Sequence, residues 1–318
     1  MNMFLNFLIA AVFAGTPLLF GTLGEIMSEK AGHLNLGVEG MMAMGACAGF
    51  MAGLLTDSFI VALIAAFAAG MLGALIYAVL TVTFMADQNV TGLTLTIFGT
   101  GLSNFVGEYM LVNSASSSLK LPEKITATIS NINIPGLSSI PVVGQLFFQY
   151  NPFVYLGILA AILCGIYLNH TKMGLNLRAI GENPAAADAA GIKVTKIKYI
   201  NILLGGGICG IGGAYSSMII CGGVWMSNSV NGLGWIAVAL VIFASWSPTK
   251  AIFGSFIFGA FNILKYYFPK TWITIPSAFY DMLPFVITAL VLVITSIRKS
   301  KENSQPASCG VNYFREER

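Results

Sequence analysis

Residues 177–196 read "LRAIGENPAAADAAGIKVTK", a polar, alanine-rich stretch between long apolar segments. Asn183 is a good helix N-cap, because its side-chain oxygen can accept from the first free backbone N–H groups. Pro184 follows at the first helical position, where its missing N–H costs nothing. Gly191 stands where a left-handed residue would close a helix. The stretch therefore predicts a capped helix of about seven residues, near 10 Å long.

A helix this short is marginal in water by itself, so another surface must hold it. One alternative is a helix that rests on lipid, but alanine offers little apolar area to lipid. Small side chains fit closely into a groove on another protein, and we assign the stretch to such a contact. The residues of this predicted contact are Asn183, Pro184, Ala185, Ala186, Ala187, Asp188, Ala189, Ala190 and Gly191.

The composition indicates that lipid surrounds most of the chain. Hydrophobic residues make up 56% of the 318 residues, charged residues make up 9%, and the mean hydropathy is +0.80. A soluble domain carries about 25% charged residues. The apolar runs are continuous and do not alternate, which is typical of spanning helices. The sequence therefore predicts an all-α polytopic membrane protein.

Stretches long enough to cross the hydrocarbon core recur along the chain. They predict roughly eight to ten transmembrane helices within residues 1–297, including a loop at about 170–197, followed by a polar cytoplasmic tail at 298–318. The stretches lie near 4–24, 33–56, 58–86, 91–112, 152–169, 198–221, 231–247, 251–268 and 279–297.

Basic residues set the predicted orientation, because Lys and Arg favour the cytoplasmic side. One cluster lies in the loop at 170–197 and another follows the last stretch. Four spans separate the clusters, so both fall on the cytoplasmic side, and residues 113–150 and the amino terminus fall outside. The clusters are Lys172, Arg178, Lys193, Lys196 and Lys198, then Arg298, Lys299 and Lys301.

Glycines predict that some helices pack closely. Gly45, Gly49 and Gly53 recur at every fourth position, and residues 205–213 read "GGGICGIGG". Small residues at such spacing let two helix backbones approach each other.

Polar residues inside the apolar stretches are candidates for a substrate pathway, since they are costly there. Asn35 and Glu39 are four residues apart, as are Asn104 and Glu108, so each pair is expected on one helical face. Amides and carboxylates can bind a sugar hydroxyl or the edge of a base. The alternative for both pairs is hydrogen bonding between helices.

Several kinds of site are missing from the sequence. It contains no G-x-x-x-x-G-K-[ST] phosphate loop, no metal-ligand spacing and no Ser–His–Asp or Cys–His pair. A net charge of +3 is too small to indicate a nucleic-acid partner. These features argue against an enzyme and against a cofactor held by this chain, and they favour a transport subunit that draws its energy from a partner.

Two motifs resemble a known family. "GLNLRAIGENPAAADAAGIKV" at 174–194 resembles the cytoplasmic coupling loop of ABC-importer permeases in the branched-chain amino acid and simple-sugar superfamily. "GTPLLFGTLGEIMSEKAGHLNLGVEGMMAMGA" at 15–46 resembles the amino-terminal signature of that superfamily, and its "NLGVEGM" is similar to the nucleoside (guanosine-type) branch. Residues 231–248 and 275–294 extend the resemblance to the carboxyl-terminal half.

The resemblance implies a type II ABC-importer-like permease bundle in a bacterial cytoplasmic membrane. It would import nucleosides by alternating access, with residues 183–191 seated in a separate ATPase that has two nucleotide-binding domains and binds ATP and Mg. The other implied partners are a second related permease or a second copy of this chain, a substrate-binding lipoprotein and membrane lipid. The alternatives are a simple sugar or another small polar solute as substrate, or an ion-coupled secondary transporter that uses buried carboxylates.

Overall fold

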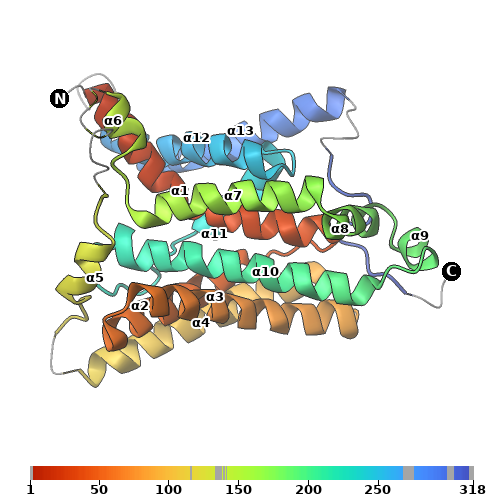
Figure 1. The fold of residues 1–318 in the computed structure, drawn as a ribbon, viewed down its shortest axis with the longest axis horizontal. Helices are drawn as coiled ribbons and strands as arrows, with labels where there is room; N and C mark the ends of the chain where they lie inside the picture. The colour runs from red at the N-terminus through yellow and green to blue at the C-terminus, as the bar shows by residue number, and fades with distance from the viewer. Residues whose placement is uncertain are drawn as a thin grey trace.

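The computed structural model describes residues 3–114, 117–132, 138, 140, 142–267, 276–298 and 304–314. In these ranges the chain is built from helices and contains no β-strand, apart from one isolated bridge between Lys120 and Val224. The long helices run side by side along the long axis of the molecule (Figure 1). The predicted all-α architecture is therefore confirmed.

Each of the nine predicted apolar stretches coincides with a helix of the described chain. Within the described residues, five helices are long and apolar enough to cross a membrane: α1, α2, α7, α3 with its π-helical end (Val79–Thr83), and α10 with its π-helical end (Ser216–Ile220). The helices are α1 (Met3–Lys30), α2 (Val38–Thr56), α3 (Phe59–Ala78), α4 (Gln88–Val112), α5 (Glu123–Thr128), α6 (Val143–Phe147), α7 (Pro152–His170), α8 (Lys172–Glu182), α9 (Pro184–Ala189), α10 (Val194–Tyr215), α11 (Leu233–Phe243), α12 (Pro248–Tyr267) and α13 (Ser277–Arg298).

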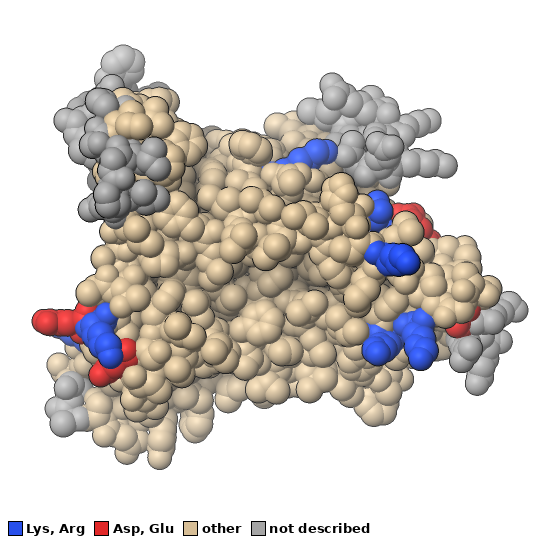
Figure 2. Space-filling model, in the orientation of Figure 1, with Lys and Arg blue, Asp and Glu red and all other residues tan. Residues whose placement is uncertain are grey.

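The two ends of the bundle differ in charge. Helices α8 and α9 lie at one end, and α5, α6 and the start of α1 lie at the opposite end (Figure 1). Figure 2 shows most of the visible Lys and Arg side chains at the end with α8 and α9, which we call the basic end. This arrangement agrees with the predicted orientation, in which the 113–150 segment and the amino terminus lie opposite the basic loop.

Helix α10 occupies the centre of the bundle and packs against α1, α2 and α3. Glycines make this close packing possible. A Cβ on Gly45 of α2 would lie 2.3 Å from the Cα of Gly210, and a Cβ on Gly213 would lie 1.7 Å from the carbonyl oxygen of Met42. The predicted glycine-mediated packing of these helices is confirmed.

Helix α2 begins later than the stretch at 33–56 predicts. Residues 33–37 are not helical, and α2 starts at Val38. Gly92 of α4 lies against the backbone of Leu36, and Gly40 lies against the backbone of Leu95. Leu95 is seven residues into α4, or about 10 Å from its first residue. The first turn of α2 therefore lies inside the bundle and not at its edge.

Helix α11 is also shorter than the predicted span at 231–247. It has 11 residues, about 16 Å at 1.5 Å per residue, whereas the hydrocarbon core is about 30 Å thick. The chain before it, residues 221–232, is non-helical and contains three glycines with positive φ, Gly222, Gly223 and Gly232. The predicted span is too long mainly at its carboxyl-terminal end, where residues 244–247 are non-helical and Ser245 and Trp246 have positive φ. An apolar run does not reveal where the backbone leaves the helical conformation.

The non-helical stretch before α2 has its backbone groups bonded by side chains of neighbouring helices. Leu34 donates its N–H to Gln88 Oε1 at 2.9 Å, and its carbonyl accepts from the Tyr77 hydroxyl at 2.7 Å. The Leu36 carbonyl accepts from Thr96 Oγ1 at 2.9 Å. Buried backbone groups must find such partners, so these three side chains permit a break in the helix at this depth.

Part of the predicted tail at 298–318 packs on the basic end of the bundle. Ser308 donates its N–H to the Gly181 carbonyl at 2.9 Å, and Asn312 Nδ2 donates to the Met85 carbonyl at 2.6 Å. Residues 299–303 and 315–318 of this tail lie outside the described residues. The described part, 304–314, is thus attached both to α8 and to the connection between α3 and α4.

Replacing Gly213 with Ala tests the central packing. The added Cβ would meet the Met42 carbonyl oxygen at 1.7 Å, so α10 and α2 must separate. We expect the free energy of unfolding to fall by about 1–3 kcal/mol, measured as a lower midpoint of thermal unfolding of the purified protein. The matched control is Gly101→Ala on α4, where an added Cβ meets nothing within 4 Å. Equal midpoints for the two variants would contradict the packing.

Candidate functional site

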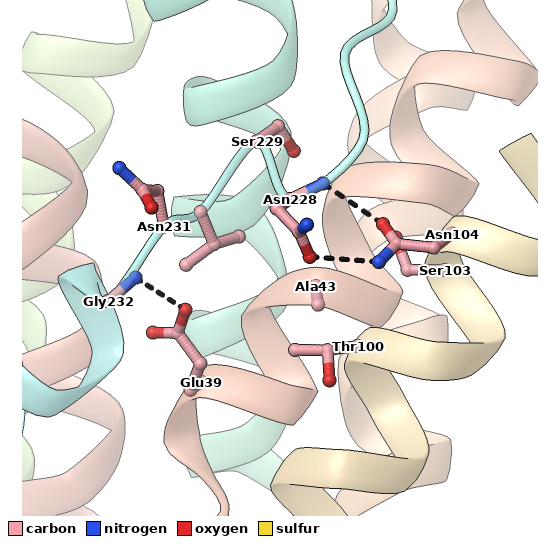
Figure 3. A pocket seen from close by; sticks show the side chains of 10 residues that line it. Glu39, Ala43, Thr100, Ser103, Asn104, Asn228, Ser229, Asn231 and Gly232 are labelled. Atoms are coloured by element: carbon pink, nitrogen blue, oxygen red, sulfur yellow. Dashed lines mark hydrogen bonds between the residues drawn. The ribbon is translucent and has the colours of Figure 1, made fainter.

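Glu39 of α2 closes the amino-terminal end of α11. Its Oε1 accepts from the Gly232 N–H at 2.7 Å (Figure 3), and its Oε2 accepts from the Gly234 N–H at 2.6 Å. The first N–H groups of a helix have no partner within the helix, and the helix dipole makes this end partly positive. The Glu39 carboxylate therefore bonds two N–H groups at the start of α11 and places a negative charge at the partly positive end of that helix.

The local sequence "NGLG" at 231–234 shapes this contact. Gly232 has φ +85°, a left-handed conformation that turns its N–H toward Glu39. A Cβ on Gly234 would lie 2.5 Å from the Cα of Glu39, so only glycine lets α11 approach α2 this closely. The close approach of α2 to α4 also requires glycine, because a Cβ on Gly40 would lie 2.3 Å from the Leu95 carbonyl oxygen.

Asn104 and Glu108 of α4 hold the chain that leads to α11. Asn104 Nδ2 donates to Asn228 Oδ1 at 2.8 Å, and Asn104 Oδ1 accepts from the Asn228 N–H at 2.9 Å (Figure 3). Glu108 Oε1 accepts from the Ser227 hydroxyl at 2.6 Å. The expected shared face is confirmed, because both residues reach adjacent positions of one segment. Their bonds go to a loop, whereas the alternative placed them between helices.

A polar cavity of about 210 Å³ lies between α2, α4 and this loop. Figure 3 shows Glu39 beside Gly232, and Asn104 and Asn228 facing each other. The lining supplies one carboxylate, several amides and several hydroxyls, which suits an uncharged solute that carries many hydrogen-bonding groups. Its polar side chains are Glu39, Thr100, Ser103, Asn104, Asn228, Ser229 and Asn231.

A larger cavity of about 950 Å³ shares residues 228–232 with the polar cavity and extends toward α12 and α13. Its wall is more apolar and includes Tyr266, Tyr280 and Phe285. The loop at 228–232 therefore lines both spaces, and a movement of this loop would change the shape of each.

Asn35 does not share a face with Glu39, contrary to the prediction. It lies in the non-helical stretch before α2, where its Oδ1 accepts from the Gly37 N–H at 2.9 Å and its Nδ2 contacts Met41 Sδ at 3.5 Å. Helical spacing does not apply before Val38, which is the reason for the difference. Asn35 shapes the start of α2 and is not among the residues that line the polar cavity.

Two buried acidic residues escaped the sequence analysis. Glu25 and Glu29 of α1 are 0% and 2% exposed. Glu25 Oε1 accepts from the Asn35 N–H at 2.8 Å, and Glu29 accepts from the Trp246 indole N–H. The first predicted span ended at residue 24, which placed both residues outside it. Their spacing of four residues, on a helix that continues to Lys30, is the sequence pattern that could have identified them as a pair. Among the described residues there is no group of three or more His, Cys, Asp or Glu side chains that could hold a metal ion.

Helix α9 has the predicted caps. Asn183 Oδ1 accepts from the Ala186 N–H at 3.0 Å, and Pro184 is the first helical residue. Gly191 has φ +83°, its N–H donates to the Asp188 carbonyl, and the Ile192 N–H donates to the Ala187 carbonyl. This pair of bonds is a Schellman motif. The helix has six residues, one fewer than expected.

Contrary to the prediction, the side chain of Ala187 is not available for contact with another protein. Its side chain is 4% exposed and packs in a cluster with Ile180 and Val194 of the same protein. Ala186, Ala189 and Ala190 are the exposed alanines of this segment. The two faces of α9 thus differ, and only the exposed face is available to another protein.

Long apolar helices, a polar cavity inside the bundle and a capped helix at the basic end define a membrane permease. The sequence model of the family described as "Branched-chain amino acid transport system / permease component" matches residues 7–293. The chain belongs to this family. It is therefore a multi-pass membrane protein and a transport component, not an enzyme. ABC transporter permeases work with an ATPase and a substrate-binding protein.

Three of the relatives that match most of the chain are named as ABC transporter permeases. The nucleoside ABC transporter permease protein NupC of Lactococcus lactis is 34% identical over 94% of this chain and 94% of its own length. The guanosine ABC transporter permease protein NupQ of Bacillus subtilis is 33% identical over 89% of each chain. The putative glucose ABC transporter permease protein TsgC13 of Haloferax volcanii is 36% identical over 80% of this chain and 75% of its own length.

Replacing Glu39 with Gln tests the cap on α11. Gln keeps the length but offers one acceptor oxygen, so an N–H at the start of α11 is left facing an NH₂ group. An unsatisfied buried group costs about 1–3 kcal/mol, and we expect uptake to fall about tenfold while the permease still inserts. The measurement is the rate of solute uptake by cells that contain equal amounts of permease in the membrane.

The matched control for this variant is Glu123→Gln on α5. Glu123 is exposed and does not line the polar cavity. Its uptake should stay within about twofold of the unchanged protein. An unchanged rate for Glu39→Gln would show that the cap does not contribute to transport.

Proposed function

We propose that this chain is the membrane subunit of an ATP-driven importer that carries nucleosides across the bacterial cytoplasmic membrane by alternating access. The observation that carries the proposal is the polar cavity beside the Glu39-capped start of α11. Amides and a carboxylate can bind the edge of a base, and hydroxyls can bind a ribose. NupC and NupQ, which match 94% and 89% of the chain, support a nucleoside as the solute.

The loop at 226–232 is the movable wall in this proposal. It has no helical hydrogen bonds of its own, and side chains of α2 and α4 hold it in place. Separation of α11 from α2 would release Gly232 and Gly234 together and open the cavity toward α12 and α13. Glu39, Asn104 and Glu108 are then the predicted pathway residues, joined by Ser227 and Asn228.

A simple sugar is the second candidate substrate. TsgC13 supports it, as does the cavity's supply of hydroxyl and amide groups, which suits any polyol. An ion-coupled secondary transporter is less well supported. NupC and NupQ are ABC transporter permeases, which supports an ATP-driven mechanism instead.

The partners follow from the same proposal. The exposed alanines of α9 would sit in an ATPase with two nucleotide-binding domains, and that ATPase would bind ATP and Mg²⁺. A second related permease, or a second copy of this chain, would complete the translocation path. A lipoprotein outside the cell would deliver the substrate, and lipid would surround the long helices.

Transport by the purified complex in lipid vesicles tests the proposal. Labelled guanosine should accumulate when ATP is supplied, and an excess of unlabelled nucleoside should compete while glucose should not. Competition by glucose alone would favour the sugar alternative. Uptake that stops with a proton uncoupler but survives ATP depletion would favour the secondary transporter.

Replacing Ala189 with Arg tests the ATPase contact. Ala189 is exposed, so a bulky charged side chain should leave insertion intact but block a close protein contact. We expect uptake to fall at least about tenfold, with less ATPase recovered with the purified permease. The control is Met173→Arg on α8, which adds the same charge at a position 44% exposed at the same end. Equal uptake by the two variants would contradict the role of α9.

A further inference from the structure

Residues 304–314 contact α8, α9 and the connection between α3 and α4. Ser308 Oγ donates to the carbonyls of Ile180 and Gly181, at 3.1 and 2.5 Å, so the segment is attached to the end of α8. Pro306 is buried, and Ser308 lies 2.9 Å from the position of a Cβ on Gly32. The segment therefore crosses the basic end from α8 past the end of α1.

The same segment contacts α9 through a side chain. The Tyr313 hydroxyl donates to Asp188 Oδ2 at 2.9 Å. Asp188 is the one charged residue in the short helix that we propose as the ATPase contact. A displacement of α9 would therefore pull on residue 313 directly.

Asn312 joins the segment to the connection between α3 and α4. Its Nδ2 donates to the Met85 carbonyl at 2.6 Å and the Ala86 carbonyl at 3.2 Å, and its Oδ1 accepts from Gln88 Nε2 at 3.1 Å. Both the nitrogen and the oxygen of the Asn312 side-chain amide are hydrogen-bonded, and Gln88 is 2% exposed. The contact is thus a specific and largely buried one, not a loose surface contact.

Gln88 links Asn312 to backbone in the interior of the bundle. While its Nε2 bonds to Asn312, its Oε1 accepts from the Leu34 N–H at 2.9 Å. Leu34 lies in the non-helical stretch 33–37 that leads into α2, and Glu39 lies in the first turn of that helix. A continuous series of hydrogen bonds and backbone therefore runs from α9 to the cap on α11.

Helix α9 has another route into the bundle, through its packing on α8 and α10. Helix α10 then meets α2 by close glycine contacts, such as that of Gly213 with the backbone of Met42. Those contacts join rigid helices. The route through residues 312 and 88 instead ends on non-helical backbone, which can change its dihedral angles without breaking a helix.

We infer that Asn312 is a positioning residue that links movement of α9 to the backbone at 34–37 and, through it, to the Glu39 cap on α11. This inference rests on the proposed role of α9 as the ATPase contact. ATP-driven displacement of α9 shifts the carboxyl-terminal segment, and the segment shifts Gln88 and Leu34. The loop at 226–232 is then released in step with the ATPase.

The test is Asn312→Ala in the complete transporter, reconstituted in lipid vesicles with its ATPase and supplied with labelled guanosine and ATP. Solute taken up and phosphate released are measured in the same sample. We expect solute carried per ATP hydrolysed to fall about tenfold, while the amount of bound ATPase and its rate of hydrolysis stay the same. A merely structural role would lower both activities together and leave their ratio unchanged.

Val311→Ala is the matched control, since Val311 is the neighbouring residue and its side chain is 60% exposed. It should keep the original ratio. Tyr313→Phe, which removes the bond to Asp188, should lower the ratio, and its combination with Asn312→Ala should lower it by less than the product of the two effects. Independent effects that multiply would place the two residues on separate routes and overturn the inference.

Asn312→Asp replaces Asn312→Ala if the alanine variant does not reach the membrane. Asp keeps the size and the acceptor for Gln88, but loses the donor to Met85 and Ala86, so the ratio should still fall. An unchanged ratio in the Asn312 variants, with Ala189→Arg blocking uptake, overturns the inference and leaves the proposed function intact. If Ala189→Arg has no effect, the proposed ATPase contact fails, and the inference fails with it.

Discussion

The structure depends on one constraint: backbone that leaves the helical conformation inside the bundle must find hydrogen-bond partners within the protein. Two stretches meet this constraint, residues 33–37 before α2 and residues 221–232 before α11. Side chains of α3 and α4 bond the first, and side chains of α2 and α4 bond the second. The polar residues Tyr77, Gln88, Thr96, Asn104 and Glu39 are thereby explained, since without them backbone N–H and C=O groups of the two breaks would lack partners.

The same constraint produces the candidate site. The two stretches lie on either side of Glu39, one leading into its helix and the other ending at its carboxylate. The polar cavity lies where the second stretch passes α2 and α4, with residues 228–232 forming one wall. A wall held by side-chain hydrogen bonds can be opened at lower cost than a packed helix, because each such bond contributes only about 1 kcal/mol net. This is a suitable property for a gate in an importer.

The motifs that resemble the ABC-importer permeases now have physical explanations. In "NLGVEG" at 35–40, Asn35 bonds the Gly37 N–H, Glu39 caps α11, and Gly40 allows contact with α4. In "NGLG" at 231–234, one glycine takes the left-handed conformation and the other admits Glu39. The two motifs are nearly 200 residues apart in the chain, yet they form the two halves of a single contact. Their residue types follow from that contact.

The sequence by itself determined the all-α membrane architecture, the order of the long helices, the basic end and the caps of α9, because these depend on local composition and on neighbouring residues. Tertiary structure alone decided where α2 begins and where α11 ends, since the non-helical residues 33–37 and 244–247 lie within the predicted apolar stretches. It also decided the partners of Glu39 and Asn104, the inward orientation of Ala187, and the contacts of residues 304–314. Each of these joins residues that are distant in the chain, and no local pattern encodes which distant group will satisfy a given donor or acceptor.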